Sequence, residues 1–162
     1  MYKAGVVTCS DKGYQGLRID ESGKIIKEIL ENRGFQVEKY IVLPDDRNEI
    51  VSELKYMTDE LKLNLILTTG GTGFSKRDVT PEASRDVIER EAYGIAEAIR
   101  YYSLSITKRA MLSRAVSGIR GNCLIVNLPG SPKAVREALE YIIDTIIHGL
   151  DILTNQDGEC AR

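Results

Sequence analysis

The fold of this chain is decided by residues 65–82, which read LILTTGGTGFSKRDVTPE. The stretch begins with a short, uninterrupted apolar run, continues with three glycines within four residues, and ends on Thr80, Pro81 and Glu82. The apolar run predicts a strand that is buried on both faces of a sheet. Glycines permit a tight turn, and Thr80 before Pro81 is typical of a helix start with the threonine as N-cap. The order therefore predicts a strand, a glycine loop and a helix.

This loop has two interpretations, an anion-binding loop and a plain connection. A glycine loop before a helix N-terminus presents backbone N–H groups and the positive end of the helix dipole, which together suit phosphate. The spacings of a P-loop and of the dinucleotide fingerprint are both absent, and glycines alone also suit a simple turn. Lys76, Arg77 and Asp78 add more charge than a connection needs. Lys76 and Arg77 either face solvent or pair with substrate anions.

Composition and charge bound the class of protein. At 162 residues we expect one domain over residues 1–154, followed by a polar tail over 155–162. The net charge of −2 gives no general signal for nucleic acid or for an anionic membrane. No apolar run approaches the roughly 20 residues that span a bilayer. Cys9, Cys123 and Cys160 show no metal-binding spacing, which favours reduced thiols and a cytoplasmic protein.

Apolar patterns predict an alternation of strands and helices along the chain. We expect strands at 4–8, 35–43, 63–69, 110–118 and 123–128, and helices at 20–32, 47–61, 81–91, 95–105 and 132–153. Ser131 before Pro132 is expected to cap the last helix. The alternation predicts an α/β fold with a mostly parallel sheet and helices on both faces.

The loops that follow the parallel strands are expected to form the site, because ligands bind outside the carboxyl ends of such strands. These loops are residues 9–13, 44–46, 70–78 and 129–131. They bring Ser10 and Asp11, which also suit a turn or a cap, near Asp45 and Asp78, whereas Asp46 is expected to cap the next helix. Carboxylates beside a phosphate-binding backbone indicate a hard cation such as Mg²⁺. The residues alone therefore predict a Mg²⁺-assisted nucleotide site that works by positioning and charge neutralisation.

Three motifs extend this interpretation. They are TTGGTGFSKRDVTPEA at 68–83, LSR at 112–114 with GIRG at 118–121, and NLPGSPK at 127–133. With these motifs the chain resembles the molybdopterin adenylyltransferase family of molybdenum-cofactor biosynthesis (the MogA/MoaB type), and the resemblance covers nearly the whole chain.

The resemblance implies a molybdopterin-binding-like, three-layer α/β/α sandwich that forms a homotrimer. It implies that ATP and molybdopterin react, with Mg²⁺, to give adenylyl-molybdopterin and pyrophosphate, with onward transfer to a molybdenum-insertion protein. Asp45 and Asp78 match the family's catalytic aspartates and are implied to hold the metal. The implied nucleotide- and molybdopterin-binding residues are Ser10, Asp11, Thr69, Gly70, Gly71, Thr72, Gly73, Ser113, Pro129, Gly130 and Ser131. A non-catalytic molybdopterin carrier and a nucleotide pyrophosphatase remain alternative functions.

Overall fold

A computed structural model describes residues 1–155 and shows a single six-stranded sheet with the strand order β2-β1-β3-β6-β5-β4. The strands are β1 (Lys3–Cys9), β2 (Gln36–Leu43), β3 (Leu65–Thr69), β4 (Arg90–Glu91), β5 (Ser117–Arg120) and β6 (Cys123–Leu128). Strands β2, β1, β3 and β6 are parallel, whereas β5 runs antiparallel to β6 and β4 antiparallel to β5. The predicted α/β fold with a mostly parallel sheet is confirmed. Except for Asn155, the predicted tail lies outside the described residues.

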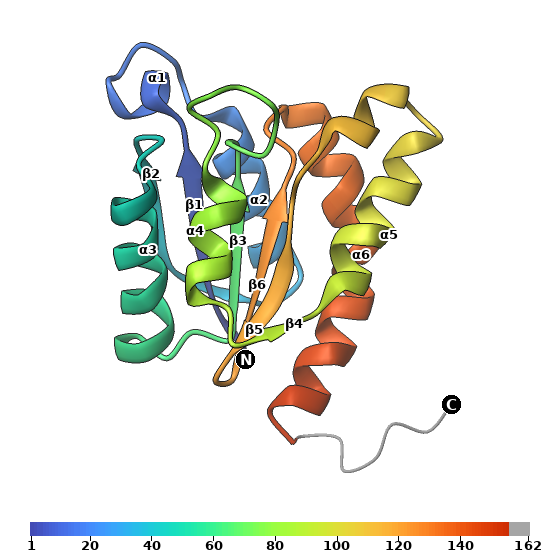
Figure 1. Cartoon of the computed structure of the whole chain (residues 1–162). Coiled ribbons are helices and arrows are strands. Elements are labelled where there is room, and N and C mark those ends of the chain that lie inside the picture. The colour runs from blue at the N-terminus through green and yellow to red at the C-terminus, as the bar shows by residue number, and fades with distance from the viewer. Residues whose placement is uncertain (156–162) are drawn as a thin grey trace.

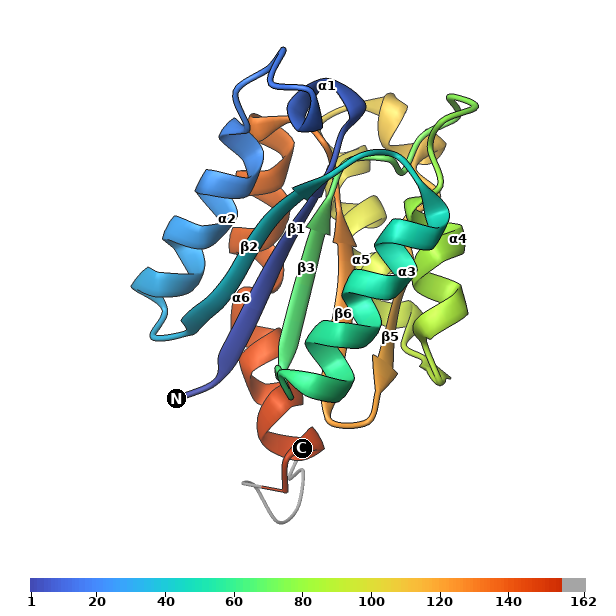
Figure 2. The same ribbon diagram turned by 90° about the vertical axis from the view of Figure 1, so that its left-hand side faces the viewer.

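The helices form one layer on each face of this sheet. They are α1 (Asp11–Tyr14), α2 (Glu21–Asn32), α3 (Arg47–Lys55) with the π-helix η1 (Tyr56–Glu60), α4 (Thr80–Val87), α5 (Tyr93–Leu104), the 3-10 helix η2 (Lys108–Leu112) and α6 (Pro132–Leu153). Helices α2, α5 and α6 cover one face, and α3 and α4 cover the other (Figures 1 and 2). Within residues 1–155, no helix combines the length and the apolar character that crossing a membrane requires.

Hydrophobic side chains of the central strands divide between two cores, one on each face. In β3, Leu65 and Leu67 belong to the core under α2 and α6, whereas Ile66 belongs to the core under α3 and α4. Strand β1 follows the same alternation with Val6 and Val7. Successive side chains of a strand point to opposite faces, so an unbroken apolar run fits a strand that is covered on both sides. The prediction for the apolar half of residues 65–82 is confirmed.

Three predicted elements are wrong in their bounds. The helix expected to reach residue 91 ends at Val87, because the next residues pair with the sheet edge through the Glu89 N–H and the Ile119 carbonyl at 2.9 Å. The strand expected from residue 110 begins only at Ser117, after η2. The helix expected over 47–61 is α-helical only to Lys55 and continues as the π-helix η1.

Asn127 joins four segments in the layer just below the loop edge. It is fully buried, its Oδ1 accepts a hydrogen bond from the Val116 N–H at 3.1 Å, and its Nδ2 donates to Thr68 Oγ1 and Ser84 Oγ, both at 2.9 Å. It therefore links β6 to β3, to α4 and to the segment before β5. Buried amides persist when their partners satisfy them, and here both donors and the carbonyl oxygen are used.

Replacing Asn127 by leucine keeps a similar volume but leaves the Val116 N–H and two hydroxyls without their partner. We expect Asn127→Leu to lower the free energy of unfolding by about 2–4 kcal/mol, as measured by urea denaturation. Asn122→Leu, at an exposed turn position, is the control and should change it by less than about 0.5 kcal/mol. Equal stability of the two variants would contradict the bridging role.

Candidate functional site

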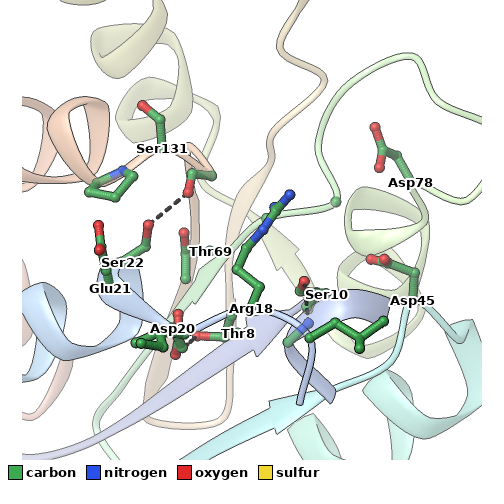
Figure 3. Close-up of a pocket in the computed structure, with 18 residues that line it drawn as sticks. Thr8, Ser10, Arg18, Asp20, Glu21, Ser22, Asp45, Thr69, Asp78 and Ser131 are labelled. Atoms are coloured by element: carbon green, nitrogen blue, oxygen red, sulfur yellow. Dashed lines mark hydrogen bonds between the residues drawn. The ribbon is translucent and has the colours of Figure 1, made fainter. Parts of the chain in front are cut away.

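A cavity of about 940 Å³ opens at the sheet edge where the parallel strands end. It is lined by the ends of β1 and β3, by α1 and the loop after it, by the N-terminal residues of α2 and α6, and by Asp45 and Asp78 (Figure 3). The size suits a small-molecule ligand, since such sites typically measure about 300–1,000 Å³. The structure therefore brings together the four loops that the sequence predicted at this edge.

The glycine loop needs glycine at two positions for steric reasons. Gly70 and Gly71 have φ values of +91° and +70°, which disfavour other residues. A Cβ atom on Gly70 would lie 2.4 Å from the carbonyl oxygen of Cys9, and one on Gly71 would lie 2.3 Å from Thr80 Oγ1. The loop backbone is thus packed directly against the end of β1 and the start of α4.

Thr80 is not the N-cap that the sequence predicted. Val79 occupies the cap position, and Thr80 is the first residue of α4. Its hydroxyl instead donates to the Gly70 carbonyl at 2.9 Å, while its N–H donates to the Gly71 carbonyl at 3.1 Å. Both polar groups of Thr80 therefore hold the glycine loop rather than the helix end.

Asp45 extends from the tip of β2 toward this loop. Asp46 caps α3 by accepting a hydrogen bond from the Glu49 N–H at 2.9 Å, as predicted, which leaves Asp45 to the cavity. Its Oδ2 accepts from the Asp11 N–H at 3.1 Å, whereas its Oδ1 is buried and accepts no hydrogen bond from the described residues. Burial raises the pKa of Asp45, and the negative charges of Asp11 and Asp78 raise it further, against the hydrogen bond from Asp11.

Asp78 lies at the end of the glycine loop and is held by that loop. Its Oδ2 accepts hydrogen bonds from the N–H groups of Gly73 at 3.1 Å and Ser75 at 3.2 Å. Figure 3 shows the carboxylates of Asp45 and Asp78 at the same end of the cavity. The structure therefore brings the two predicted catalytic aspartates together from different strand ends.

Asp11 and Arg77 form an ion pair beside this cavity. The Arg77 guanidinium donates to both carboxylate oxygens of Asp11 at 3.0 Å, and Asp11 Oδ1 also accepts from the Asp45 N–H at 2.9 Å. Hydrogen bonding from Arg77 lowers the pKa of Asp11. Asp11 does not line the cavity, so the structure gives it a role in joining the loops. Of the two interpretations of Lys76 and Arg77, solvent exposure fits Lys76, and Arg77 is bound to a protein carboxylate.

Three other predicted residues line the cavity while also fixing its loops. The Ser10 hydroxyl accepts from the Gly13 N–H at 3.0 Å and caps α1. Thr69 Oγ1 donates to the Pro129 carbonyl at 2.6 Å, which joins the ends of β3 and β6. Ser131 caps α6 as predicted.

The other predicted binding residues lie around a second, smaller cavity of about 270 Å³. Thr72, Gly73, Ser113 and Pro129 line it, and Gly130 lines both cavities. The predicted set is therefore divided by the glycine loop and by the 129–131 turn. This division could not be predicted from the sequence, because it depends on how the segment before β5 packs against the loop.

The sequence interpretation missed the wall of the main cavity that precedes and begins α2. Arg18, Asp20, Glu21 and Ser22 lie there beside Thr8 of β1, and Ser22 Oγ donates to the Gly130 carbonyl at 2.7 Å. Asp20 is the N-cap of α2. A cap after the first strand is the signal that would have placed this helix start at the same sheet edge.

The donor set at Asp45 and Asp78 fits a magnesium ion that is also held by substrate. Residues 1–155 contain no cluster of three or more His, Cys, Asp or Glu side chains that would bind a metal by itself. Mg²⁺ usually needs only one or two carboxylates when phosphates supply other ligands. The buried Asp45 Oδ1, to which none of the described residues donates a hydrogen bond, is the observation that suits such an ion. Cys9 is no nucleophile here, because burial raises the pKa of its thiol to about 12.

Comparisons with known proteins find similar chains along most of the length of this one. The family model described as "Probable molybdopterin binding domain" matches residues 5–148. A protein named Molybdopterin adenylyltransferase from Helicobacter pylori is 40% identical over 151 residues, which cover 92% of this chain and 86% of that protein. A protein named Gephyrin from Dictyostelium discoideum is 43% identical, and this chain spans only 22% of its length while 94% of this chain is covered.

A solved structure gives the same result in three dimensions. The crystal structure of a protein described as the molybdopterin biosynthesis enzyme MoaB from Thermus thermophilus matches with a TM-score of 0.90 at 44% sequence identity. The match covers 96% of this chain and 98% of that one. The three-layer fold is therefore shared along nearly the full length of both chains.

The close contact at Gly70 leads to a stability prediction. We expect Gly70→Ala to lower the free energy of unfolding by about 2–4 kcal/mol, because the left-handed φ and the clash with the Cys9 carbonyl act together. Gly34→Ala is the matched control: its φ is +86°, but a Cβ there meets no atom within 4 Å. Gly34→Ala should lower the free energy of unfolding by only about 1–2 kcal/mol. Chemical denaturation measures both, and equal losses would show that the contact with Cys9 is unimportant.

Proposed function

Since the chain belongs to the family of the molybdopterin-binding domain, we propose that it is a molybdopterin adenylyltransferase of molybdenum-cofactor biosynthesis. In the proposed reaction, a terminal phosphate oxygen of molybdopterin attacks the α-phosphorus of ATP. A new P–O bond forms, the bond to the bridging oxygen breaks, and pyrophosphate leaves with the electron pair. The products are adenylyl-molybdopterin and pyrophosphate.

The observation that carries this proposal is the pair of carboxylates, Asp45 and Asp78, at one end of a cavity bounded by a glycine loop. Each is fixed through Oδ2 by backbone N–H groups. We propose that their remaining oxygens hold Mg²⁺, which would neutralise phosphate charge when bound. The residues then act by orientation and by electrostatics, and the proposed reaction uses no covalent nucleophile from the described residues.

The walls of the two cavities are proposed to hold the two substrates. Gly70 and Gly71, with Ser10, Thr69 and Ser131, line the larger cavity, and Thr72, Gly73, Ser113 and Pro129 line the smaller one. Gly130 separates them and is available to both. Adjacent cavities that share a wall suit a reaction in which two bound molecules must meet. Asp11 is proposed to support the site by positioning Asp45 and the Arg77 side chain.

A cytoplasmic location and transfer of the product to a molybdenum-insertion protein complete the proposal. Cys9 and Cys123 are free, buried thiols, which suits a reducing compartment.

We expect the purified protein to form adenylyl-molybdopterin from ATP and molybdopterin when Mg²⁺ is added. Asp78→Asn and Asp45→Asn should each lower the rate by about 100-fold or more, because each removes a charge that holds the cation. Product formation followed by chromatography is the measurement. Asp46→Asn, on the exposed neighbour that caps α3, is the control and should keep its activity.

Stability shows whether the loss reflects chemistry or folding. Asp45→Asn should melt at or above the wild-type temperature at pH 7, because it removes a partly buried charge whose pKa is raised. The folded protein binds the Asp45 proton at a higher pH than the unfolded chain does. The advantage of the variant should therefore shrink as pH falls through that raised pKa. An active Asp78→Asn variant would contradict the assigned role.

The same experiment separates the alternative functions. A carrier would bind molybdopterin in calorimetry but show no Mg²⁺-dependent binding of ATP. A pyrophosphatase would hydrolyse ATP in the absence of the pterin. Either result, without adenylyl-molybdopterin, would overturn the proposal.

We also propose a homotrimer, supported by apolar side chains exposed on α5, on η2 and between them. They are Tyr101, Leu104, Ile106, Met111 and Leu112. A group of exposed apolar residues of this kind marks an interaction surface.

Light scattering at micromolar concentration is expected to give three times the chain mass of 18.0 kDa. Tyr101→Glu should lower that mass by placing a charge in the interface, whereas Tyr14→Glu, on α1, should not. A monomeric wild-type protein would refute the trimer.

A further inference from the structure

Arg18 is the one positively charged side chain among the described residues that line the main cavity. The other charged side chains there are carboxylates: Asp20, Glu21, Asp45 and Asp78. Such a cavity repels phosphate groups unless cations balance it. Mg²⁺ bound by Asp45 and Asp78 would balance only the end of the cavity where those two residues lie.

The backbone that carries Arg18 is anchored on its N-terminal side. The Leu17 N–H donates to the Lys12 carbonyl at 2.9 Å, and the Gly16 N–H donates to the Gly13 carbonyl at 3.2 Å. Gly16 has a φ of +76°, a left-handed conformation that glycine adopts readily in turns. The loop therefore leaves α1 along a fixed course.

The backbone is anchored equally well on its C-terminal side by Asp20. One oxygen of this carboxylate accepts from Thr8 Oγ1 at 2.7 Å and from the Tyr40 hydroxyl, and the other accepts from the Gly23 N–H at 3.0 Å. Asp20 thus ties the loop to β1, β2 and α2 together. The Asp20 carboxylate already accepts hydrogen bonds from these three donors, so it does not need Arg18 as an ion-pair partner.

The Arg18 side chain itself has no protein partner within residues 1–155. It makes no hydrogen bond and no ion pair there. Figure 3 shows its guanidinium reaching into the cavity, between the wall that contains Ser22 and the end that contains Asp45 and Asp78. Arg77 is different, because Asp11 already occupies its guanidinium.

We propose that Arg18 binds a phosphate group of a substrate in the main cavity. A guanidinium can donate two parallel hydrogen bonds to the oxygens of a phosphate. In Arg18 all five N–H donors are available for this. Arg18 would position the phosphate beside the carboxylate pair. It would also balance the negative charge of the cavity and the phosphate that Mg²⁺ does not neutralise. The inference rests on the proposed function, in which both ATP and molybdopterin carry phosphate.

Three variants test the inference: Arg18→Ala, Arg18→Lys and, as control, Lys12→Ala. Lys12 carries the same charge on α1 but does not line the cavity. Calorimetry with Mg²⁺ measures the binding of ATP, of molybdopterin and of inorganic pyrophosphate. We expect Arg18→Ala to weaken at least one of them by about 10- to 100-fold, because a charge-assisted hydrogen bond is lost. Arg18→Lys keeps the positive charge but loses the planar pair of N–H donors. Its affinity should therefore lie between those of the wild type and of Arg18→Ala.

The pattern of losses identifies the phosphate. A loss for ATP and pyrophosphate assigns Arg18 to the nucleotide, and a loss for molybdopterin alone assigns it to the pterin phosphate. All variants should melt within about 1 °C of the wild type, since Arg18 makes no contact that stabilises the fold.

Unchanged binding of all three probes by Arg18→Ala would overturn the inference, and so would an equal loss in Lys12→Ala. The proposed function is tested separately by wild-type product formation. A wild-type protein that binds pyrophosphate through Arg18 but makes no adenylyl-molybdopterin would support the inference and defeat the function.

Discussion

The contact between Gly70 and the end of β1 is the constraint on which the site depends. The Gly70 backbone lies so close to the Cys9 carbonyl that even a methyl group would be 2.4 Å from its oxygen. Strands β1 and β3 are neighbours in the sheet, and their ends could approach this closely only where a side chain is missing. Thr80 then fixes the loop from the other side by bonding to Gly70 and Gly71. The loop is therefore a packed part of the sheet edge, and its N–H groups have fixed directions.

A loop fixed in this way can hold charges that would otherwise destabilise the protein. Asp45 has a buried oxygen that accepts no hydrogen bond from residues 1–155, and burial, with the charges of Asp11 and Asp78, raises its pKa. A cavity whose charged side chains are carboxylates except for Arg18 is unfavourable for the isolated chain, and its surroundings must compensate. Two buried cores and the satisfied amide of Asn127 directly beneath supply that compensation. In the proposed function, a bound cation and phosphate groups would relieve this repulsion.

Much of the fold follows from local patterns, and the parts that do not follow depend on distant partners. The apolar run 65–69, the cap at Ser131 and the cap at Asp46 were predictable because neighbouring residues determine them. Strand β4 has only two residues, and it forms because they pair with β5. A local pattern of two residues cannot predict such a strand. The same applies to the site. Asp45 was predictable from its place at a strand tip, but the pairing of Arg77 with Asp11 joins residues 66 positions apart.

The two carboxylates show why backbone donors suit this site better than side chains would. Asp45 and Asp78 are each held through Oδ2, by N–H groups of Asp11 in one case and of Gly73 and Ser75 in the other. Backbone donors carry no net charge, so they orient a carboxylate without neutralising it. Arg77, in contrast, neutralises the charge of Asp11 by forming an ion pair with it. The second oxygen of each carboxylate would remain available to the proposed cation. Orientation is thus supplied before any ligand binds, and in the proposed reaction the substrate and the metal would balance the charge.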